Sequence, residues 1–236
     1  MPFLTDSIAS AFGLIFTWDP QLAVIVRLSV TVSLVSTLLA GMVAVPLAFT
    51  IVFNRFFGKR LLIMVINTLL SVPTVVIGLF VYAFIARRGP LGSLGLLYTP
   101  GAIVIGQVLL IVPLMTALTL AAINRMDQRY RQTAKTLGAN GRQVMGVVFK
   151  EARFGIAAAV ITAFGRVISE IGISMMLGGN IKGFTRTITT AMALEYDKGA
   201  FTLAVALGIV LLAVSFSINL LFHFVQGRTE PEPFSP

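Results

Sequence analysis

The sequence contains no cysteine and few charged residues, and each shortage excludes a class of protein. Without cysteine, the chain has no disulfide, no thiolate metal ligand and no cysteine nucleophile. Charged residues make up 11% of the chain, against about a quarter in soluble domains. The hydrophobic fraction is 57% and the mean hydropathy is +0.94. These values exclude an ordinary soluble domain and predict an all-α polytopic membrane protein, whose surroundings are the lipid bilayer.

Two familiar signals are also missing. The first basic residue is Arg27, so we expect no cleavable signal peptide with a positively charged n-region. Gly58 and Lys59 resemble the end of a phosphate-binding loop, but Phe53 and Arg60 stand where that pattern needs glycine and Ser or Thr. We therefore expect no ATP site of this kind, and no cofactor or metal in this chain.

The net charge is +9 and the isoelectric point is about 10.7. In a soluble protein such values would suggest nucleic-acid binding. Here most basic residues lie in short loops beside apolar runs, where Lys and Arg mark the cytoplasmic side of a membrane protein. The charge therefore indicates topology, and we expect no nucleic-acid partner.

Five apolar segments are long enough to cross a bilayer. They run over about 22–53, 61–86, 102–123, 154–177 and 201–225. The first three contain Pro46, Pro73 and Pro113, which helices in a bilayer tolerate, and we expect Pro46 to kink its helix or to break its hydrogen-bond ladder. Kinked spans suit a pathway that opens and closes, but they also occur in ordinary helix packing, so both interpretations stay open here.

Three regions follow from this pattern. Residues 1–21 are expected to lie in the membrane interface or to form a frayed terminus. Residues 22–226 form the transmembrane domain, and residues 227–236 form a disordered, proline-rich tail. In the first span, small residues recur every four positions, which favours close helix packing over a polar pathway. These residues are Ser29, Ser33, Thr37 and Gly41.

Five spans place the two termini on opposite sides of the membrane. One side would hold the loops at 54–60 and 125–153 and the C-terminus, with eleven Lys or Arg; the other would hold six. The positive-inside rule then predicts a cytoplasmic C-terminus and an external N-terminus. Arg87 and Arg88, on the external side, argue mildly against this orientation.

Residues 125–153 form the one long polar interval, with a formal charge of +5. The segment from Asp127 to Leu137 contains no Gly or Pro and predicts a short helix, in which Ala134 and Leu137 would present one small apolar face. Gly138 is placed to end this helix, and a second helix would start near Gln143. This pattern predicts a protruding helix–glycine–helix hairpin, although an ordinary basic loop is the simpler alternative.

Arg166 and Glu170 lie in the fourth segment. Arg166 is twelve residues past its start, about 18 Å along a helix, which is near mid-bilayer. The two side chains are spaced to neutralise each other on one helix face. Because charges at that depth normally face a bundle interior or a water-filled route, we interpret both as candidate translocation residues.

Two further groups follow these charges. Met175 and Met176 precede Gly178 and are typical of a hydrophobic gate that repacks, or of a loosely packed helix end. Lys182, Thr185 and Arg186 then form an external cluster that would suit an oxyanion in transit or the rim of a docking protein; a solvated loop is the alternative.

The basic interval resembles the coupling loop of ABC importer permeases, which reads Glu-Ala-Ala, three residues, Gly, and later Ile and Pro. The corresponding residues here are Gln132, Thr133, Ala134, Gly138, Val148 and Glu151. Ala134 and Gly138 match, and Val148 is a conservative replacement. The resemblance implies that this loop contacts an ATPase, with contact residues Arg131, Gln132, Thr133, Ala134, Lys135, Leu137 and Gly138.

The run from Arg166 to Glu195 resembles the permeases of tungstate importers, which are related to molybdate and sulfate permeases. This resemblance extends over about residues 25–225. It implies the type I importer permease fold, a homodimer in a prokaryotic inner membrane, a cytoplasmic ATPase dimer that holds ATP and Mg, and an extracytoplasmic substrate-binding protein. A molybdate or sulfate permease is the near alternative. A stand-alone secondary transporter and a membrane scaffold are alternatives of other classes.

Overall fold

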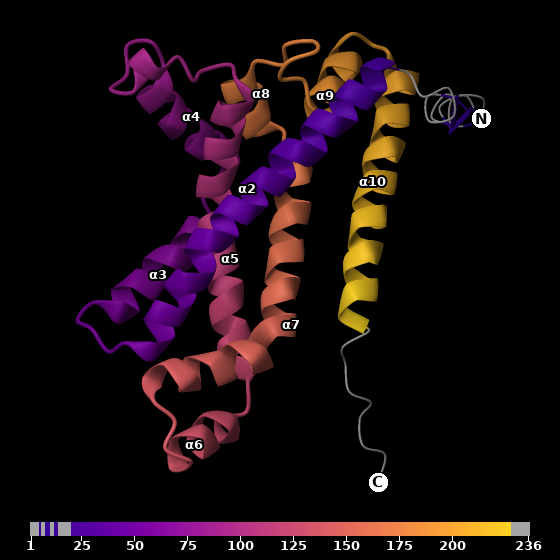
Figure 1. Cartoon of the computed structure of the whole chain (residues 1–236). Coiled ribbons are helices and arrows are strands. Elements are labelled where there is room, and N and C mark those ends of the chain that lie inside the picture. Colours follow the sequence, from indigo (N-terminus) through magenta and orange to yellow (C-terminus); the bar gives the residue numbers. More distant parts are fainter. Residues whose placement is uncertain (1–4, 6–7, 10–11, 14–19, 228–236) are drawn as a thin grey trace. The chain divides into compact units, whose positions relative to one another are not determined.

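The computed structural model describes residues 5, 8, 9, 12, 13 and 20–227, without the side chains of 128 and 221–227. The described residues form helices and no strand, which confirms the all-α prediction (Figure 1). The elements are α2 (Pro20–Phe53), α3 (Lys59–Leu69), α4 (Thr74–Ile85), the 3-10 turn η1 (Gly92–Leu94), α5 (Pro100–Arg125), α6 (Gln128–Thr136), α7 (Gly141–Ile168), α8 (Gly172–Gly178), α9 (Ile188–Asp197) and α10 (Phe201–Gly227). The predicted interfacial segment at 1–21 and tail at 227–236 lie almost wholly outside the described residues.

The chain divides into two compact units. The central unit holds residues 31–179, and the N/C unit holds residues 1–30 and 180–236. Helix α2 belongs to the N/C unit up to Val30 and to the central unit from Thr31 onward.

Three of the described helices, α2, α5 and α10, are each long and apolar enough to cross a membrane. Two more spans exist if each of two bent helix pairs counts as one: α3 with α4, bent by 103°, and α7 with α8, bent by 59°. The described residues therefore provide three to five spans. The second and fourth predicted spans correspond to these two pairs, and each is divided by a sharp break.

The break between α3 and α4 follows from Pro73. Proline has no N–H to donate to the carbonyl of Leu69, and its ring disfavours helical geometry in the residue before it. The chain leaves α3 through tight turns, in which Ser71 N–H donates to Thr68 and Val72 N–H to Leu69. In contrast, α2 and α5 continue through Pro46 and Pro113. Of the three prolines, only Pro73 lies at a break between helices, where it precedes the first residue of α4.

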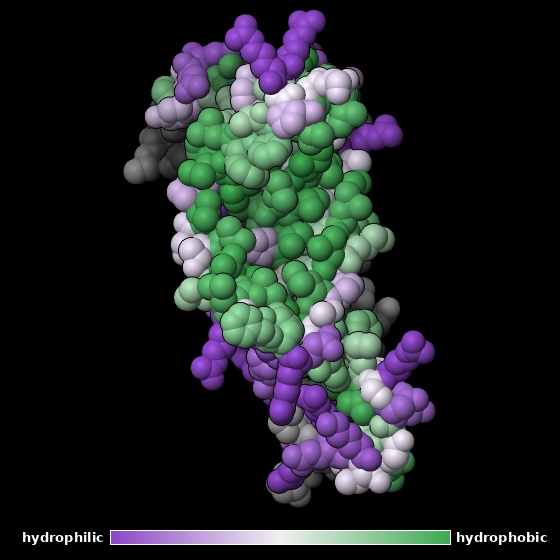
Figure 2. Space-filling model, turned by 90° about the vertical axis from the view of Figure 1, so that its left-hand side faces the viewer, coloured by the Kyte–Doolittle hydropathy of each residue, from purple (hydrophilic) through white to green (hydrophobic). Residues whose placement is uncertain are grey.

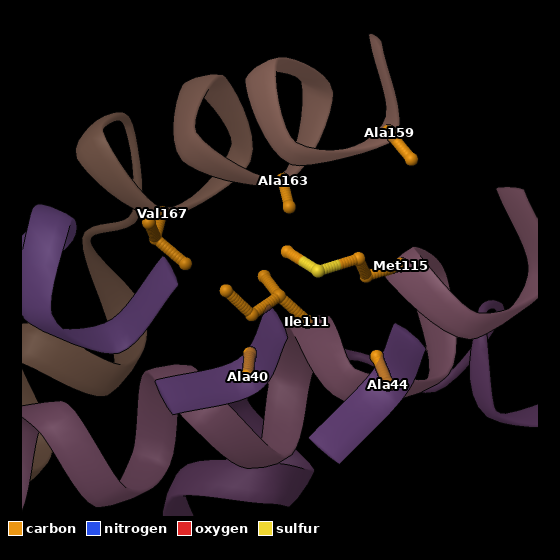
Figure 3. Close-up of a cluster of buried hydrophobic side chains, with 7 residues drawn as sticks. All are labelled: Ala40, Ala44, Ile111, Met115, Ala159, Ala163 and Val167. Atoms are coloured by element: carbon orange, nitrogen blue, oxygen red, sulfur yellow. The ribbon is translucent and has the colours of Figure 1, made fainter. Parts of the chain in front are cut away.

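Small residues let the long helices of the central unit approach closely. Ile111 and Met115 of α5 project between alanines of α2 and α7 (Figure 3). The buried side chains of this cluster are Ala40, Ala44, Ile111, Met115, Ala159, Ala163 and Val167. Because lipid offers little hydrophobic drive for helix association, such close van der Waals packing is the main attraction between the helices.

Gly155 lies where α7 approaches α5 closely. A Cβ placed on it would lie 2.5 Å from Cβ of Ala122. We predict that Gly155→Ala lowers the free energy of unfolding by about 1–3 kcal/mol, because the extra methyl overpacks the crossing. Gly146→Ala is the matched control, since Gly146 lies on the same helix with nothing within 4 Å of its added Cβ. Thermal unfolding in detergent measures both, and equal midpoints would contradict this packing.

The outer face of the central unit is apolar in its middle. On the side that carries α3 and α4, apolar side chains form a continuous band, and hydrophilic side chains gather at the end that carries α6 (Figure 2). This distribution is typical of a protein surrounded by hydrocarbon and bounded by polar interfaces.

The N/C unit is held together by α9 and α10 against the first turns of α2. Ile188, Ala191 and Leu207 form its buried cluster. The Ser29 hydroxyl accepts the N–H of Ile188 at 2.8 Å and donates to the carbonyl of Ile25. Ser29 is 3% exposed, so it acts in helix packing, as the small-residue pattern favours.

Candidate functional site

The predicted hairpin is present in the central unit and has defined ends. Asp127 caps α6 by accepting the N–H of Arg129 at 2.8 Å. Gly138 follows α6 with φ of +80°, a conformation that glycine adopts readily. Asn140 and Gln143 then form a reciprocal capping box that starts α7, with bonds of 2.8 and 3.0 Å. These caps make residues 127–153, hereafter the hairpin, a rigid projection (Figure 1).

The inner face of the hairpin is fastened to the spans. Ala134 is 8% exposed and packs in one cluster with Val144 and Val148 of α7, Phe49 of α2 and Ile123 of α5. Leu137, three residues on, is 82% exposed. The expectation that both side chains form one apolar face is therefore wrong, because Ala134 is used to join α6 to the central unit's own core.

The outer face presents most of the remaining predicted contact residues. Gln132, Thr133, Lys135, Leu137 and Gly138 are exposed. Arg131 is half-buried, with its guanidinium carbon 4.9 Å from the centre of the Phe53 ring. The arginine therefore stabilises the attachment of the hairpin through a cation–π contact, in addition to any contact with a partner.

Two exposed apolar side chains on the hairpin were missed by sequence reasoning. Tyr130 is 49% exposed and Phe149 is 50% exposed. Tyr130 lies seven residues before Leu137, a spacing that puts both on the same side of a helix and that was visible in the sequence. Exposed aromatic and leucine side chains on a rigid projection are groups that dock into a groove of a partner.

Arg166 and Glu170 form an ion pair at the break between α7 and α8. The Arg166 Nη1 atom lies 3.2 Å from Glu170 Oε2, as the spacing predicts. Helix α7 ends at Ile168, so Glu170 lies in the break itself. Its other carboxylate oxygen accepts the N–H of Ile173 at 3.4 Å, in the first turn of α8. Glu170 thus neutralises the Arg166 guanidinium and also accepts a hydrogen bond from a backbone N–H in the first turn of α8, where such groups have no partner within the helix.

The two partners of this pair differ in exposure. The Glu170 side chain is 4% exposed, whereas that of Arg166 is 45% exposed within this chain. If Arg166 lies near mid-bilayer, as its place in the sequence predicts, contact with lipid would cost at least about 2.5–3.5 kcal/mol. The open side of its guanidinium is therefore predicted to face water or protein.

A buried carboxamide next to this break had no predicted role. Gln107 on α5 is 2% exposed, accepts the hydroxyl of Ser36 at 2.8 Å and donates to the carbonyl of Val167 at 3.3 Å. It thereby links α2, α5 and the last turn of α7. A single carboxamide within an otherwise apolar span was the available signal, because such a group must find partners in a bilayer.

Helix α8 is tightly packed against α4 and α5. A Cβ on Gly106 would meet Ile173 Cγ2 at 2.5 Å and Leu177 Cδ1 at 2.6 Å, and a Cβ on Gly78 would meet the Met176 sulfur at 2.9 Å. Met175 and Met176 are half-buried. This packing argues against a loose helix end and leaves the repacking gate as the prediction for the two methionines.

The predicted external cluster lies in the N/C unit, and its members have different surroundings. Lys182 is exposed. Thr185 is buried, and its hydroxyl accepts the N–H of Ile181 at 3.0 Å. The Arg186 guanidinium donates to the side chain and the carbonyl of Asn180, at 3.1 and 3.4 Å. Thr185 and Arg186 thus organise the turn before α9, and Lys182 is the most accessible of the three.

Within the described residues, no group of three or more His, Asp or Glu side chains could hold a metal ion. Two places in the central unit are candidate functional sites: the hairpin, with its exposed Tyr130 and Leu137, and the α7–α8 break, with its Arg166–Glu170 ion pair.

Comparisons with known proteins agree with this geometry. The chain is 41% identical to the tungstate uptake system permease protein TupB of Peptoclostridium acidaminophilum, over 96% of this chain and 99% of that protein. It is 36% identical to TupB of Campylobacter jejuni, over 94% of this chain and 93% of that protein. It is 29% identical to the molybdenum transport system permease protein ModB of Escherichia coli K12 (91% and 96%).

A solved structure shares the fold. The crystal structure of a bacterial ABC transporter involved in the import of the acidic polysaccharide alginate superposes with a TM-score of 0.77 at 18% identity, over 98% of this chain and 90% of that one. The family described as binding-protein-dependent transport system inner membrane component matches residues 36–231. The chain therefore belongs to this family, as a multi-pass permease component of the inner membrane.

Proposed function

We propose that this chain is the transmembrane subunit of an ATP-driven importer for an oxyanion, and that the oxyanion is tungstate. The observation that carries the proposal is the 41% and 36% identity, over nearly the full length, to two tungstate permeases. The molybdenum permease of E. coli, at 29%, and a sulfate permease of Synechococcus elongatus, at 26%, are more distant. These values favour tungstate over molybdate and sulfate.

The hairpin is the proposed contact with a cytoplasmic ATPase dimer, which would hold ATP and Mg. Its caps make it rigid, and Ala134 and Arg131 fasten it to the spans. A push on Leu137 or Tyr130 would therefore reach α2, α5 and α7 without being absorbed by the loop. Rigid elements of this kind carry a conformational change between sites.

The proposed pathway runs past Arg166, Glu170, Met175 and Met176. Arg166 is half-exposed in the single chain, which supports a second copy of the chain, with the pathway between the copies. An oxyanion passing this point would meet a guanidinium already oriented by Glu170. The break at 169–171 lies beside that guanidinium and is the proposed hinge about which α8, together with the helices packed on it, would move relative to α7.

The proposed orientation places the hairpin and the C-terminus in the cytoplasm and the N-terminus outside. The turn with Lys182, Thr185 and Arg186 would then face the extracytoplasmic side, where a substrate-binding protein docks. A related fold supports this partner: the alginate importer was also crystallised with an alginate-bound periplasmic protein. Family membership gives no support to the stand-alone secondary transporter or to the scaffold.

Uptake in proteoliposomes tests the proposal. The chain is reconstituted with its ATPase subunits and its binding protein, and initial rates are measured for labelled tungstate, molybdate and sulfate. We expect uptake to require ATP on the side of the membrane that carries the ATPase subunits. At subsaturating concentrations of each anion, we expect the initial rate to be highest for tungstate. A faster rate for molybdate or sulfate would show that this anion, and not tungstate, is the preferred substrate. Uptake without ATP would contradict the proposal that the chain belongs to an ATP-driven importer.

A further inference from the structure

The loop between α2 and α3 has no role in the transport cycle proposed above, although Arg131 of the hairpin lies beside it. A cleft of about 380 Å³ opens here between the ends of α2, α3, α5 and α6. Its polar lining consists of Lys59, Asn67, Asn124 and Arg131, and its walls include Ile63 and Leu120. The described lining thus contains two cations and two carboxamides and no carboxylate.

Both cations are held in place. Lys59 is half-buried, and its Nζ donates to the carbonyl of Asn54 at 3.3 Å. Arg131 is oriented by the ring of Phe53, which itself stacks on Phe49 with ring centres 6.1 Å apart. No acidic residue occurs in the sequence between Asp19 and Asp127, so the segments that supply the rest of this cleft carry no negative charge. An anionic group is the ligand that such a cleft favours.

A second cleft of about 530 Å³ adjoins the first, because it shares Lys59 and Ile63; its lining also includes Arg55, Phe57 and Arg60. Phe57 is fully exposed, and apolar side chains line the adjoining surface of α3. Leu61 and Met64 are each 58% exposed. At eleven residues, α3 measures about 17 Å and cannot cross a bilayer alone. It begins with two cations and presents apolar side chains beyond them, as interfacial helices do.

We propose that this cationic cleft binds the headgroup of an anionic phospholipid, with its acyl chains lying along the apolar face of α3. The two adjoining clefts are lined by cations, and Phe57 and the apolar face of α3 are exposed beside them, so a ligand with both a phosphate and acyl chains matches them. A free oxyanion would leave the apolar walls and Phe57 uncovered. Figure 2 shows hydrophilic side chains directly beneath the apolar band of this face, as a headgroup layer requires.

The proposal is tested by lipid binding to the purified full-length chain in neutral detergent. Phosphatidylglycerol, phosphatidylcholine with the same acyl chains, and inorganic phosphate are titrated separately, and bound ligand is counted by native mass spectrometry. We expect phosphatidylglycerol to bind preferentially. Lys59→Gln and Arg131→Gln should each weaken its binding about fivefold, the factor equivalent to about 1 kcal/mol per basic side chain near an anionic surface.

Asn67→Asp tests the same cleft in a variant that should fold normally. Asn67 is exposed, and the replacement changes little except that it adds a negative charge. It should also weaken phosphatidylglycerol binding. Lys150→Gln is the control, since this exposed cation on α7 lines neither cleft, and it should bind lipid as the parent chain does. The thermal midpoint without lipid verifies that each variant is folded.

Three results would overturn the proposal. Equal binding of phosphatidylcholine would remove the requirement for net negative charge. Displacement of phosphatidylglycerol by millimolar phosphate would assign the cleft to a free anion. Release of the lipid when the ATPase subunits are added would assign it to a protein partner.

Discussion

A Glu170→Gln variant is expected to lose tungstate uptake by about two orders of magnitude. Glutamine keeps the shape of the side chain and can still accept the N–H of Ile173, but it no longer neutralises Arg166. An arginine without a partner within a bilayer costs at least about 2.5–3.5 kcal/mol, which corresponds to that factor. Initial rates of ATP-dependent uptake in proteoliposomes measure the effect.

The same variant should also lose stability. Removing one charge of a buried ion pair costs about 3–5 kcal/mol. The 45% exposure of Arg166 places the expected loss at or below the lower end of that range. Glu195→Gln is a control, because it removes the partner of Lys198 from a more exposed pair at 2.9 Å. Such pairs contribute about 0–1 kcal/mol, so the control should unfold near the parent midpoint.

The double variant Arg166→Gln with Glu170→Gln separates two roles of this pair. If the charges only neutralise each other, replacing both restores stability and uptake together. If Arg166 also meets the anion, stability recovers and uptake stays low. We expect the second result. Recovery of uptake in the double variant would show that the pair is structural and would remove Arg166 and Glu170 from the pathway.

Gly138→Pro is expected to prevent stimulation of the ATPase by the permease. Gly138 has φ of +80°, whereas proline is restricted to about −65°, so the turn between α6 and α7 cannot form as it stands. Proline also removes the N–H that Gly138 donates to Lys135 at 3.0 Å. Co-purification with the ATPase subunits and the stimulated ATPase rate measure the result, and we expect stimulation to fall at least tenfold.

Gly199 provides a matched control for the backbone change. It has φ of +77°, its N–H donates to Tyr196 at 2.9 Å, and nothing lies within 4 Å of an added Cβ, as at Gly138. Gly199→Pro therefore strains a turn of the same geometry outside the hairpin. It should leave ATPase assembly intact. If both proline variants assemble and stimulate the ATPase equally, the hairpin is not the coupling element.

Leu137→Asp extends this comparison to a side chain. At 82% exposure, Leu137 makes little contribution to the folded chain, so its replacement should leave the thermal midpoint unchanged. A loss of ATPase binding in this variant would assign the contact to the side chain at the end of α6. The location of Leu137 outside the core is known only from the structure, since Ala134, three residues earlier, faces inward.

Much of the fold was predictable because the bilayer leaves few choices. Unpaired backbone groups are excluded from hydrocarbon, so long apolar runs must be helices, and their lengths locate the spans. The turn at Gly138 was predictable for a similar reason, since glycine after a helix-forming segment favours a left-handed cap. The Arg166–Glu170 pair followed from its spacing and from the cost of unpaired charge at that depth.

The three prolines mark the limit of such local reasoning. Pro46, Pro73 and Pro113 occur in similar apolar runs, yet only Pro73 lies at a break between two helices. Each proline removes the same backbone hydrogen bond, and the outcome depends on whether surrounding groups and packing compensate for it. Pro73 thus marked where a break could occur, but neither the 103° size of the bend between α3 and α4 nor the cleft beside α3 could be predicted from the sequence.

The basic interval 125–153 has features that its local sequence predicts and others that only tertiary contacts determine. Its charge, its helix-forming segment and Gly138 were sufficient to predict a hairpin, because these are properties of neighbouring residues. Its contacts were decided by tertiary structure alone: Ala134 against Phe49, and Arg131 over Phe53. Likewise, Gln107 joins Ser36 to Val167 across 71 and 60 residues of chain. Such pairings arise from helix packing, which local sequence patterns do not encode.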